Sequence, residues 1–519
     1  MLDQDIKTQL KGIFAALSSN MAFRLLSRGS SPDADQMKEF LKDVASSSPK
    51  LSVELAEADV EAPTFEIIKQ GKPTGVRFCG IPNGHEFTTL LLAVLNADGQ
   101  GKNLPDEAIT ARIKALNGPI KLTTFVSLTC TNCPDVAQAL NLITLLNPGV
   151  EHTVTDGAVV PAMVEALNIQ SVPTVYAGDT ILSVGRTTLG DLIDKLETMY
   201  GSDSATSITP VVREYDVVVL GSGPAGATAA IYSARKGFNT AVVAKTIGGQ
   251  VRETMSIENL TSVPETTGPK LAADIKEHLG NYPIDVFENR TVDSADIAGA
   301  EKTLRCAHET FKAKALIIAT GAGWRKLSIP GENEHIGHGV AYCTHCDGPF
   351  YAGRRVAVVG GGNSGMEAAI DLAGICPHVD LFEFMDTLKA DGVLQEKAKS
   401  MGNIDMHLST QVLEIIGDGT SVSGVKVKDR VTGLESVYDV AGVFVQIGLL
   451  PNSAPFKDQL PMTKGGEIIV NERCRTDVKG VYAAGDVTNV PYKQVVVAMG
   501  EGAKAALSQF EDSMRGELS

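Results

Sequence analysis

The hydrophobic residues of the chain follow two patterns, and the change lies near residue 210. After it, β-branched runs such as "YDVVVLG" alternate with alanine-rich segments, which is typical of strands and helices in a parallel α/β sheet. Before it, segments starting at Ala62 and Val172 each predict a Pro-Thr start, two short strands and a helix. Their offset of about 110 residues is too long for a solenoid and predicts tandem small α/β domains, unless the similarity is chance.

A small, polar segment separates the two patterns. "YGSDSATSITP" (residues 200–210) ends in proline and predicts a linker. The boundaries that follow are 1–110 and 111–199 for the small domains, 211–329 with 450–519 for a first nucleotide domain in two parts, and 330–449 for a second. The fold class is therefore α/β throughout.

The first glycine-rich turn lies at Gly221–Gly226, between a predicted strand and a predicted helix. Gly221 permits the tight turn, Gly223 lets the backbone approach a pyrophosphate, and Gly226 lets helix and strand pack closely. The phosphate then binds at the positive end of the helix. This turn predicts dinucleotide binding. The next strand ends at Lys245, where an acid is usual, so its ribose contact stays unassigned.

The second glycine-rich turn repeats the arrangement with Gly360, Gly362 and Gly365. Its next strand, "HVDLF", ends at Glu383, about twenty residues past the turn. A carboxylate there accepts hydrogen bonds from a ribose 2′-hydroxyl and repels a 2′-phosphate, and no arginine follows closely. We therefore expect NADH rather than NADPH; the alternative for Glu383 is a solvated strand end.

Two further strand ends suggest that one nucleotide domain is discontinuous. Thr320-Gly321 ends a strand just before the second unit, and Gly485-Asp486 ends one some 260 residues after the first glycine-rich turn. Both make sense if the chain leaves the first domain, builds the second and returns.

Two cysteines of "AYCTHCDGPF", Cys343 and Cys346, are spaced as Cys-x-x-Cys. A zinc site needs four ligands and this pair supplies two, while a structural disulfide across so short a loop stabilises little. A redox dithiol explains more, because this spacing lowers the thiol pKa and Asp347 could exchange a proton with the leaving thiolate. We read His345 as a tuning or bystander residue.

A second pair, Cys130 and Cys133, precedes an amphipathic helix in "LTCTNCPDV". A helix N-terminus favours thiolate there. With Val-Pro about forty residues on, the order resembles thioredoxin, which implies a cis Pro173 facing the dithiol. Glu86 is expected to be a surface glutamate, and the alternative is a position near this dithiol. The remaining cysteines, expected to be small buried hydrophobes, are Cys79, Cys306, Cys376 and Cys474.

Composition narrows the class of partner. The net charge of -16 disfavours nucleic acid and anionic membranes, and the sequence has neither a secretory signal pattern nor a long apolar run. Eight cysteines in 519 residues indicate a few functional thiols, so we expect a cytoplasmic protein without a metal site.

The order of these motifs over residues 211–519 resembles the low-molecular-weight thioredoxin reductases, and "GGQ", "IEN" and "YKQ" match flavin-contacting segments of that family. The whole chain resembles the flavoprotein F subunits of bacterial alkyl hydroperoxide reductases: two tandem thioredoxin-like folds followed by FAD and NAD(H) domains. The FAD contacts that this implies are Gly221, Ser222, Gly223, Pro224, Ala225, Gly226, Gly248, Gly249, Gln250, Asn259, Thr320, Gly321, Gly485, Asp486, Lys493 and Gln494. The NAD contacts are Gly360, Gly361, Gly362, Asn363, Ser364, Gly365, Glu367, Glu383, Ile447 and Gly448.

The resemblance also implies an electron path. Electrons would pass from NADH through FAD to Cys343–Cys346, then to Cys130–Cys133 and to the disulfide of a two-cysteine peroxiredoxin, the C subunit of such reductases, with Asp347 as proton donor. It implies a homodimer, and serving both partners would require a domain rotation. Two alternatives stay open: a fused thioredoxin reductase for general disulfides, and an NADH oxidase or flavin-binding protein with inert cysteines.

Overall fold

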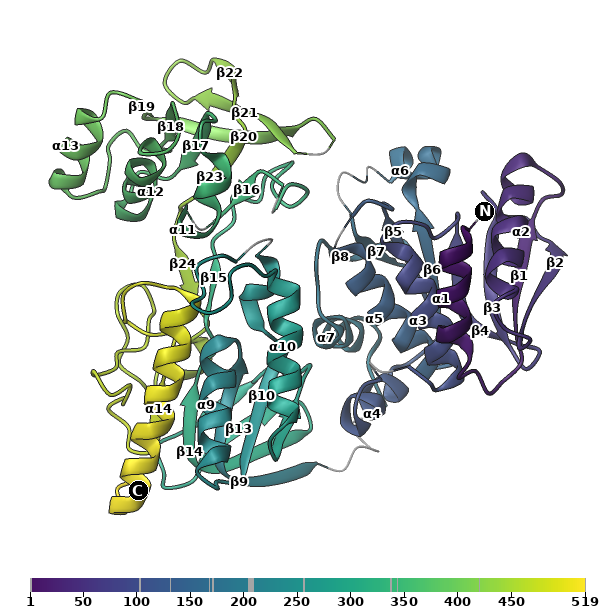
Figure 1. Cartoon of the computed structure of the whole chain (residues 1–519), viewed down its shortest axis with the longest axis horizontal. Coiled ribbons are helices and arrows are strands. Elements are labelled where there is room, and N and C mark those ends of the chain that lie inside the picture. The colour runs from purple at the N-terminus through teal and green to yellow at the C-terminus, as the bar shows by residue number, and fades with distance from the viewer. Residues whose placement is uncertain are drawn as a thin grey trace. The chain divides into compact units, whose positions relative to one another are not determined.

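The computed structural model describes residues 2–101, 104–130, 132–167, 169, 172–203, 210–254, 257–336, 338–342, 344–419 and 421–518, with the backbone alone at 253, 345 and 346. It separates into two compact units, Met1–Thr209 and Pro210–Ser519 (Figure 1). The predicted linker contains this boundary, and its residues 204–209 lie outside the described part of the chain. Within the described residues, no helix combines the length and apolar character needed to span a bilayer.

The first unit is built on one eight-stranded sheet in the order β2-β1-β3-β4-β6-β5-β7-β8. Its first half comprises α1 (Gln4–Phe14), β1 (Met21–Ser27), α2 (Pro32–Ala45), β2 (Leu51–Glu57), β3 (Thr64–Lys69), β4 (Lys72–Cys79) and α3 (Glu86–Asp98). Its second half comprises α4 (Glu107–Ala115), β5 (Ile120–Val126), α5 (Cys133–Leu146), β6 (Val150–Asp156), α6 (Pro161–Ala166), β7 (Thr174–Ala177), β8 (Thr180–Val184) and α7 (Leu189–Tyr200).

The two halves of this sheet have the same topology. In each, a parallel strand pair (β1 with β2, β5 with β6) is continued by an antiparallel hairpin (β3–β4, β7–β8). The halves join where β4 pairs in parallel with β6. The hairpins and the helices α3 and α7 are the elements predicted from the repeated Pro-Thr segments. The boundary expected at residue 110 falls inside α4. One continuous sheet runs through both halves, so the two predicted domains form one compact unit.

The second unit begins with a sheet in the order β11-β10-β9-β14-β13-β12, to which β25 adds beside β14. Alternate residues of β9 face opposite sides: Val217 and Val219 pack under the helices, and Val218 and Leu220 pack on the other face. A sheet buried on both faces requires the continuous apolar strands that the sequence shows. Its elements are β9 (Val211–Ser222), α9 (Pro224–Arg235), β10 (Thr240–Ile247), α10 (Gly268–Gly280), β11 (Ile284–Phe287), β12 (Ser294–Asp296), β13 (Lys302–Cys306), β14 (Glu309–Ile318), β25 (Val481–Ala483) and α14 (Val495–Arg515).

The chain between the two parts of this first, mixed sheet builds a second sheet, which is parallel throughout and has the order β16-β23-β17-β18-β19. Val356 and Val358 pack against α12, while Ala357 and Val359 pack against the antiparallel sheet β20-β21-β22. Its elements are β16 (Val340–Ala341), α11 (Thr344–Asp347), β17 (Val356–Val359), α12 (Asn363–Ala373), β18 (Val379–Phe382), α13 (Gly392–Ser400), β19 (Ile404–His407), β20 (Thr410–Gly417), β21 (Val422–Asp429), β22 (Glu435–Asp439) and β23 (Gly442–Val445). Two short antiparallel strands, β15 (Ala322–Trp324) and β24 (Leu449–Pro451), pair where the chain leaves and re-enters the first sheet.

Candidate functional site

The first glycine-rich turn joins β9 to α9 with the shape that a pyrophosphate requires. Gly221 has a φ of +104°, and a Cβ at this position would overlap the carbonyl of Ala319. A Cβ on Gly226 would overlap the carbonyl of Gly221, so strand and helix meet backbone to backbone. Around Gly223 the nearest described atom to such a Cβ is 3.8 Å away, which leaves room at the helix N-terminus. The turn therefore fits a dinucleotide phosphate.

Ser222, at the end of β9, also suggests a ligand here. Its side chain is 2% exposed, and among the described residues its hydroxyl has no hydrogen-bond partner. Buried hydroxyls are ordinarily satisfied, so an unsatisfied one beside an open helix N-terminus fits an anionic ligand that supplies the missing bond.

The C-terminal part of the chain packs directly on the first glycine-rich turn. A Cβ on Gly502 of α14 would overlap the carbonyl of Ala225 in α9, and Gly485 lies against the Ala225 side chain. The amide of Gly485 donates to the Glu501 carboxylate at 2.9 Å. The predicted return of the chain to the first domain therefore takes place at this turn.

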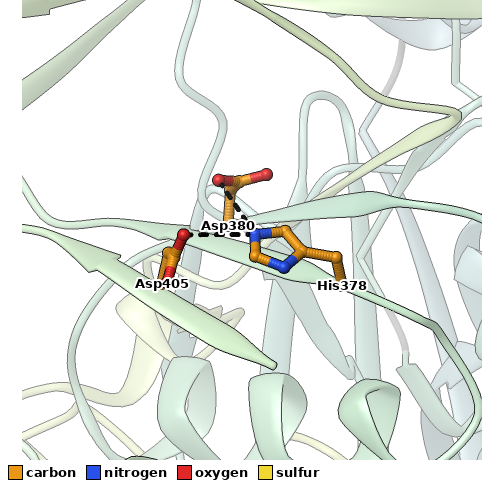
Figure 2. A group of neighbouring side chains, drawn as sticks. All are labelled: His378, Asp380 and Asp405. Atoms are coloured by element: carbon orange, nitrogen blue, oxygen red, sulfur yellow. Dashed lines mark ion pairs between the residues drawn. The ribbon is translucent and has the colours of Figure 1, made fainter. Parts of the chain in front are cut away.

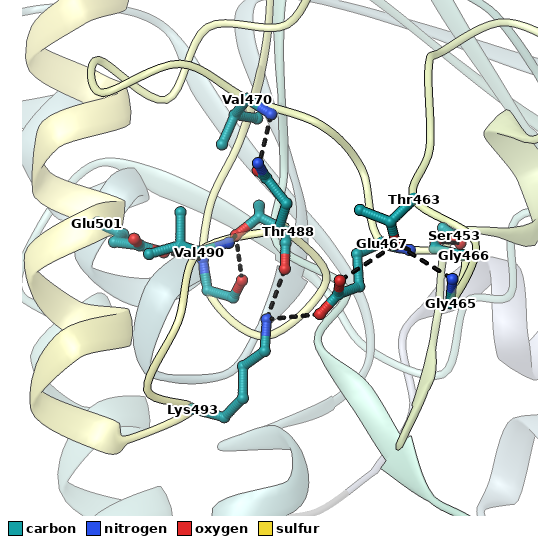
Figure 3. Close-up of polar contacts among 12 residues, drawn as sticks. Ser453, Thr463, Gly465, Gly466, Glu467, Val470, Thr488, Val490, Lys493 and Glu501 are labelled. Carbon is teal, nitrogen blue, oxygen red and sulfur yellow. Dashed lines mark hydrogen bonds and ion pairs between the residues drawn. The ribbon is translucent and has the colours of Figure 1, made fainter. Parts of the chain in front are cut away.

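A lysine holds the segment that follows Gly485. Lys493 donates to the carbonyl of Thr488 at 2.5 Å and pairs with Glu467 at 3.2 Å, as Figure 3 shows. Burial raises the pKa of Asp486, and the nearby Lys493 opposes that rise. The predicted contacts Asp486 and Lys493 thus belong to one polar network, and the sequence patterns gave no sign of its acidic members Glu467 and Glu501.

Three other predicted FAD segments lie near this network or near the turn. Asn259 donates to the side chain of Gln494 at 3.2 Å across 235 residues, so the structure brings these two predictions together. Gly248 donates to the carbonyl of Ser222 at 2.7 Å. The amide of Gln250, oriented to satisfy both neighbours, donates to Ala322 and accepts from the indole of Trp324.

Thr320 and Gly321 lie where β14 ends. The Thr320 hydroxyl donates to the Asn452 carbonyl at 2.8 Å, and the Asn452 amide donates back to the Thr320 carbonyl at 2.9 Å. This reciprocal pair joins the two crossings between the sheets of the second unit.

The second glycine-rich turn, between β17 and α12, has the same geometry as the first. A Cβ on Gly360 would overlap the carbonyl of Gln446, and one on Gly365 would overlap the carbonyl of Gly360. No described atom lies within 4 Å of a Cβ on Gly362, so the backbone is open where α12 begins. Exposed side chains follow on α12 at the predicted positions Asn363, Ser364 and Glu367, and Ile447 and Gly448 follow β23. This turn also fits a dinucleotide phosphate.

Glu383 lies directly against the second turn. Its carboxylate accepts from the amide of Gly361 at 2.5 Å and from the amide of Met385 at 2.7 Å. These bonds orient the carboxylate and leave it further acceptor capacity, because each oxygen has two lone pairs. A ribose next to the phosphate site could therefore donate to it.

Replacing Glu383 tests this contact. We expect Glu383→Ala to lower kcat/KM for NADH roughly tenfold and to raise it for NADPH, because a hydrogen-bond acceptor is lost together with the charge that repels a 2′-phosphate. Steady-state kinetics with both nucleotides would show this. Glu396→Ala, at an exposed position of α13, is the control. An unchanged NADH:NADPH ratio would contradict the assignment.

Charged side chains also cluster at the other end of β18. Among the described residues, His378, Asp380 and Asp405 carry ligand atoms close enough to share a cation (Figure 2). Asp380 is fully buried, however, and its oxygens already accept from Arg355 at 2.8 and 3.1 Å and contact His407 at 3.0 Å. These bonds make it an ion-pair network that ties β17, β18 and β19 together.

The Cys-x-x-Cys pair of the first unit lies where β5 meets α5. Cys130 and Cys133 form a disulfide; Cys133 is fully buried and Cys130 is half-buried. The amide of Cys133, the first residue of α5, donates to the Cys130 sulfur at 3.1 Å. The Val172–Pro173 peptide bond is cis, as predicted, and the Val172 carbonyl lies 3.8 Å from the Cys130 sulfur.

Glu86 is not at the surface, so the expectation for it was wrong. It is 1% exposed at the start of α3, and among the described residues the one polar group that acts on its carboxylate is the Thr89 side chain, at the margin of hydrogen-bond geometry, which opposes the effect of burial on the pKa. Burial raises its pKa to about 7. It lines a small cavity with Val126 and Leu128, at the end of the strand that leads to Cys130. The signal was present in the sequence, because Glu86, Leu90 and Ala93 share a face at helical spacing.

The second predicted dithiol is only partly described. Cys343 lies outside the described residues, and of Cys346 the structure describes the backbone, within α11. Asp347, at the end of α11, has its pKa raised by burial to about 6. A carboxyl with such a pKa can give and take a proton near neutral pH.

The other four cysteines are buried, as expected. Burial raises the pKa of each thiol, to about 12 for Cys306 and about 11 for Cys474. Thiols of this kind are unreactive. The members are Cys79, Cys306, Cys376 and Cys474.

Two glycine-rich turns, one in a discontinuous mixed sheet and one in a parallel sheet, are typical of an oxidoreductase that binds two dinucleotides. Residues 215–502 match the family model of pyridine nucleotide-disulphide oxidoreductases, and residues 120–198 match the thioredoxin domain. A thioredoxin reductase from Streptococcus pyogenes covers 58% of this chain and 99% of its own, with 34% identity and a TM-score of 0.56.

Relatives that span the whole chain define the family more closely. The alkyl hydroperoxide reductase F subunit of Xanthomonas campestris is 45% identical over 99% of this chain and 97% of its own length. The Escherichia coli F subunit is 43% identical over 99% of each. The chain therefore belongs to the family of alkyl hydroperoxide reductase F subunits.

Family membership confirms the predicted fold class and the type of enzyme. The protein is an oxidoreductase that combines thioredoxin-like folds with a pyridine nucleotide-disulphide oxidoreductase body, and its cofactors are FAD and a nicotinamide nucleotide. The roles of individual site residues stay predictions.

Proposed function

We propose that the protein reduces the disulfide of a two-cysteine peroxiredoxin with electrons from NADH, which supports the reduction of hydroperoxides. The observation that carries this proposal is the combination in one chain of a thioredoxin-like disulfide, Cys130–Cys133, with a body that holds two dinucleotide sites. An enzyme that delivers electrons to another protein needs a terminal dithiol with one accessible sulfur, and Cys130 is the more accessible of this pair.

The first glycine-rich turn holds FAD in this proposal. The open backbone at Gly223 and the unpartnered Ser222 receive its pyrophosphate. The segments around Gln250, Asn259, Asp486 and Gln494 line the rest of the cofactor. When bound, FAD would accept the hydride of NADH and pass an electron pair to the Cys343–Cys346 disulfide, which becomes a dithiol.

The second glycine-rich turn holds NADH. The open backbone at Gly362 receives its pyrophosphate, and Glu383 accepts from its adenosine ribose. The exposed side chains of Asn363, Ser364 and Glu367 lie on the first turns of α12, beside that phosphate.

Electrons then move by thiol–disulfide exchange. The Cys343–Cys346 dithiol is oxidised to a disulfide as the Cys130–Cys133 disulfide is reduced, with two electrons and two protons transferred. Asp347 donates and accepts a proton beside the first pair, because its raised pKa suits that exchange near neutral pH.

Cys130 is the residue that attacks the partner. It is the more exposed cysteine, and the Cys133 amide stabilises its thiolate. The Cys130 thiolate attacks one sulfur of the peroxiredoxin disulfide and expels the other as a thiolate. Cys133 then attacks the mixed disulfide, restoring the Cys130–Cys133 disulfide and releasing the reduced partner.

The proposal extends to assembly and location. The partner is a peroxiredoxin of the kind that forms the C subunit of alkyl hydroperoxide reductases, and the enzyme acts as a homodimer in the cytoplasm. Because Cys343–Cys346 must meet both the flavin and the Cys130–Cys133 pair of the other unit in turn, a domain rotation in the second unit forms part of the proposal.

An anaerobic titration of the oxidised holoenzyme with NADH tests the path. Flavin bleaching monitors the titration. We expect the uptake of about three electron pairs per chain, one for FAD and one for each disulfide. A single pair would leave the flavin alone and would overturn the proposal. Two pairs would place one dithiol outside the path, and thiol labelling of Cys130 and of Cys346 would identify it.

A comparison of substrates separates this function from a general disulfide reductase. NADH oxidation is measured with the disulfide forms of a two-cysteine peroxiredoxin, of thioredoxin and of insulin. Preference for peroxiredoxin is expected, and equal turnover of all three would contradict the assigned partner.

A further inference from the structure

Phe384, which directly follows Glu383, lies at an exposed position beside the second glycine-rich turn. Its side chain is 48% exposed, although a phenylalanine is ordinarily buried. The guanidinium of Arg430 covers one face of the ring, with its carbon 3.7 Å from the ring centroid. An aromatic ring covered on one face by a cation and exposed to solvent offers a platform for another flat group.

The backbone around this ring is held on both sides. Three consecutive carbonyls, those of Glu383, Phe384 and Met385, accept hydrogen bonds at 2.8, 2.6 and 2.7 Å. Their donors are the amides of Thr410 and Ser409 and, for Phe384, the Arg430 side chain. A solvent-exposed loop would leave such carbonyls to water. The ring is therefore presented by a preorganised segment.

The chemistry of the ligand places a flat group beside this ring. Glu383 is hydrogen-bonded to the turn that receives the pyrophosphate, and its proposed partner is the adenosine ribose. The ribose carbon that bears the 2′-hydroxyl is bonded to the carbon that bears adenine. If the ribose binds the Glu383 carboxylate, the adenine attached to the neighbouring ribose carbon lies close to that carboxylate. Phe384 is the next residue along the chain, so its ring is available to the base.

We propose that Phe384, backed by Arg430, is the stacking platform for the adenine of NADH and sets the affinity of the enzyme for the dinucleotide. This inference rests on the proposed function of the second turn and deepens it. Stacking on an aromatic ring recognises the π-face of the base, and Arg430 holds the ring in place through its carbonyl bond and its contact with the opposite face.

The sharpest test compares NADH with reduced nicotinamide mononucleotide, which carries the same hydride but no adenine. For Phe384→Ala in the holoenzyme we expect the KM for NADH to rise roughly tenfold with kcat within about twofold. The kinetics with the mononucleotide should not change. Phe384→Tyr should restore the NADH KM, because the ring is retained.

A control variant on the neighbouring turn shows whether the effect is specific to the Phe384 ring. Val431→Ala, at a position 81% exposed on the neighbouring turn, should leave both substrates unaffected. Equal losses with NADH and the mononucleotide would show that Phe384 supports the strand rather than the base, and an unchanged NADH KM would also overturn the proposal. If the wild-type flavin is reduced by neither compound, the proposed NADH function fails first, and the two failures are thereby distinguished.

Discussion

Cys130→Ser is expected to lower peroxiredoxin-dependent NADH oxidation by about a thousandfold or more while flavin reduction by NADH stays unchanged. Serine cannot form the mixed disulfide, and the more buried Cys133 cannot take over the attack on a partner protein because it is 0% exposed. The two rates separate because the proposed FAD site and the Cys343–Cys346 motif belong to the other compact unit. Stopped-flow flavin bleaching and steady-state turnover with peroxiredoxin measure the two steps.

The control for Cys130→Ser is Cys79→Ala. Cys79 lies in the first half of the same unit, and burial raises its thiol pKa, so its removal should leave turnover intact. Peroxiredoxin turnover retained in Cys130→Ser would show that electrons leave the enzyme directly from the second unit.

Glu86→Gln is expected to stabilise the first unit at alkaline pH and not at acidic pH. The folded-state pKa of Glu86 is raised to about 7 from an ordinary 4.5, so folding favours its protonated form. The stability that depends on this proton is fully present below pH 4.5 and is lost as the pH rises through 7. The wild type should therefore lose up to about 3 kcal/mol relative to the glutamine variant between these limits.

The difference is measured at each pH by urea unfolding of the full-length protein. Pulsed labelling of the buried Cys79 thiol reports how much of the first unit is unfolded at each urea concentration. Comparing variants at one pH cancels the pH dependence of labelling itself. Glu57→Gln, at an exposed position of β2, is the matched control and should behave as wild type. If the unfolding midpoints of Glu86→Gln and the wild type differ equally at pH 5 and pH 8, the Glu86 carboxyl does not have a raised pKa near 7 in the folded unit.

The position of Glu86 suggests a reason for keeping a buried carboxyl there. A buried carboxyl with a pKa near 7 can exchange protons at the pH of the reaction, and it lines a cavity at the end of the strand that leads to Cys130. Its stability cost above neutral pH is typical of groups retained for chemistry. A pH profile of the exchange step in Glu86→Gln would show whether it supplies that proton.

Local motifs determined much of this protein in advance. The glycine-rich turns, the Cys-x-x-Cys pairs and the change of pattern near residue 210 each depend on neighbours a few residues apart, so the sequence alone predicted the fold class and the chemistry. The steric demands at Gly226 and Gly365 are local as well, since each glycine meets the carbonyl of a residue five positions earlier.

Tertiary structure decided what depends on distant partners. No periodicity could show that Asn259 meets Gln494, or that Arg430 covers Phe384 from 46 positions away, although no arginine follows Glu383 closely along the chain. Nor could it show that β4 joins β6, which makes one sheet of two predicted domains. Helical spacing could have suggested that Glu86 is buried, but its raised pKa arises from the packed surroundings that remove water from it. Short-range patterns fix which backbone turns and which reactive groups exist, whereas their electrostatics and their partners depend on contacts that only the folded chain makes.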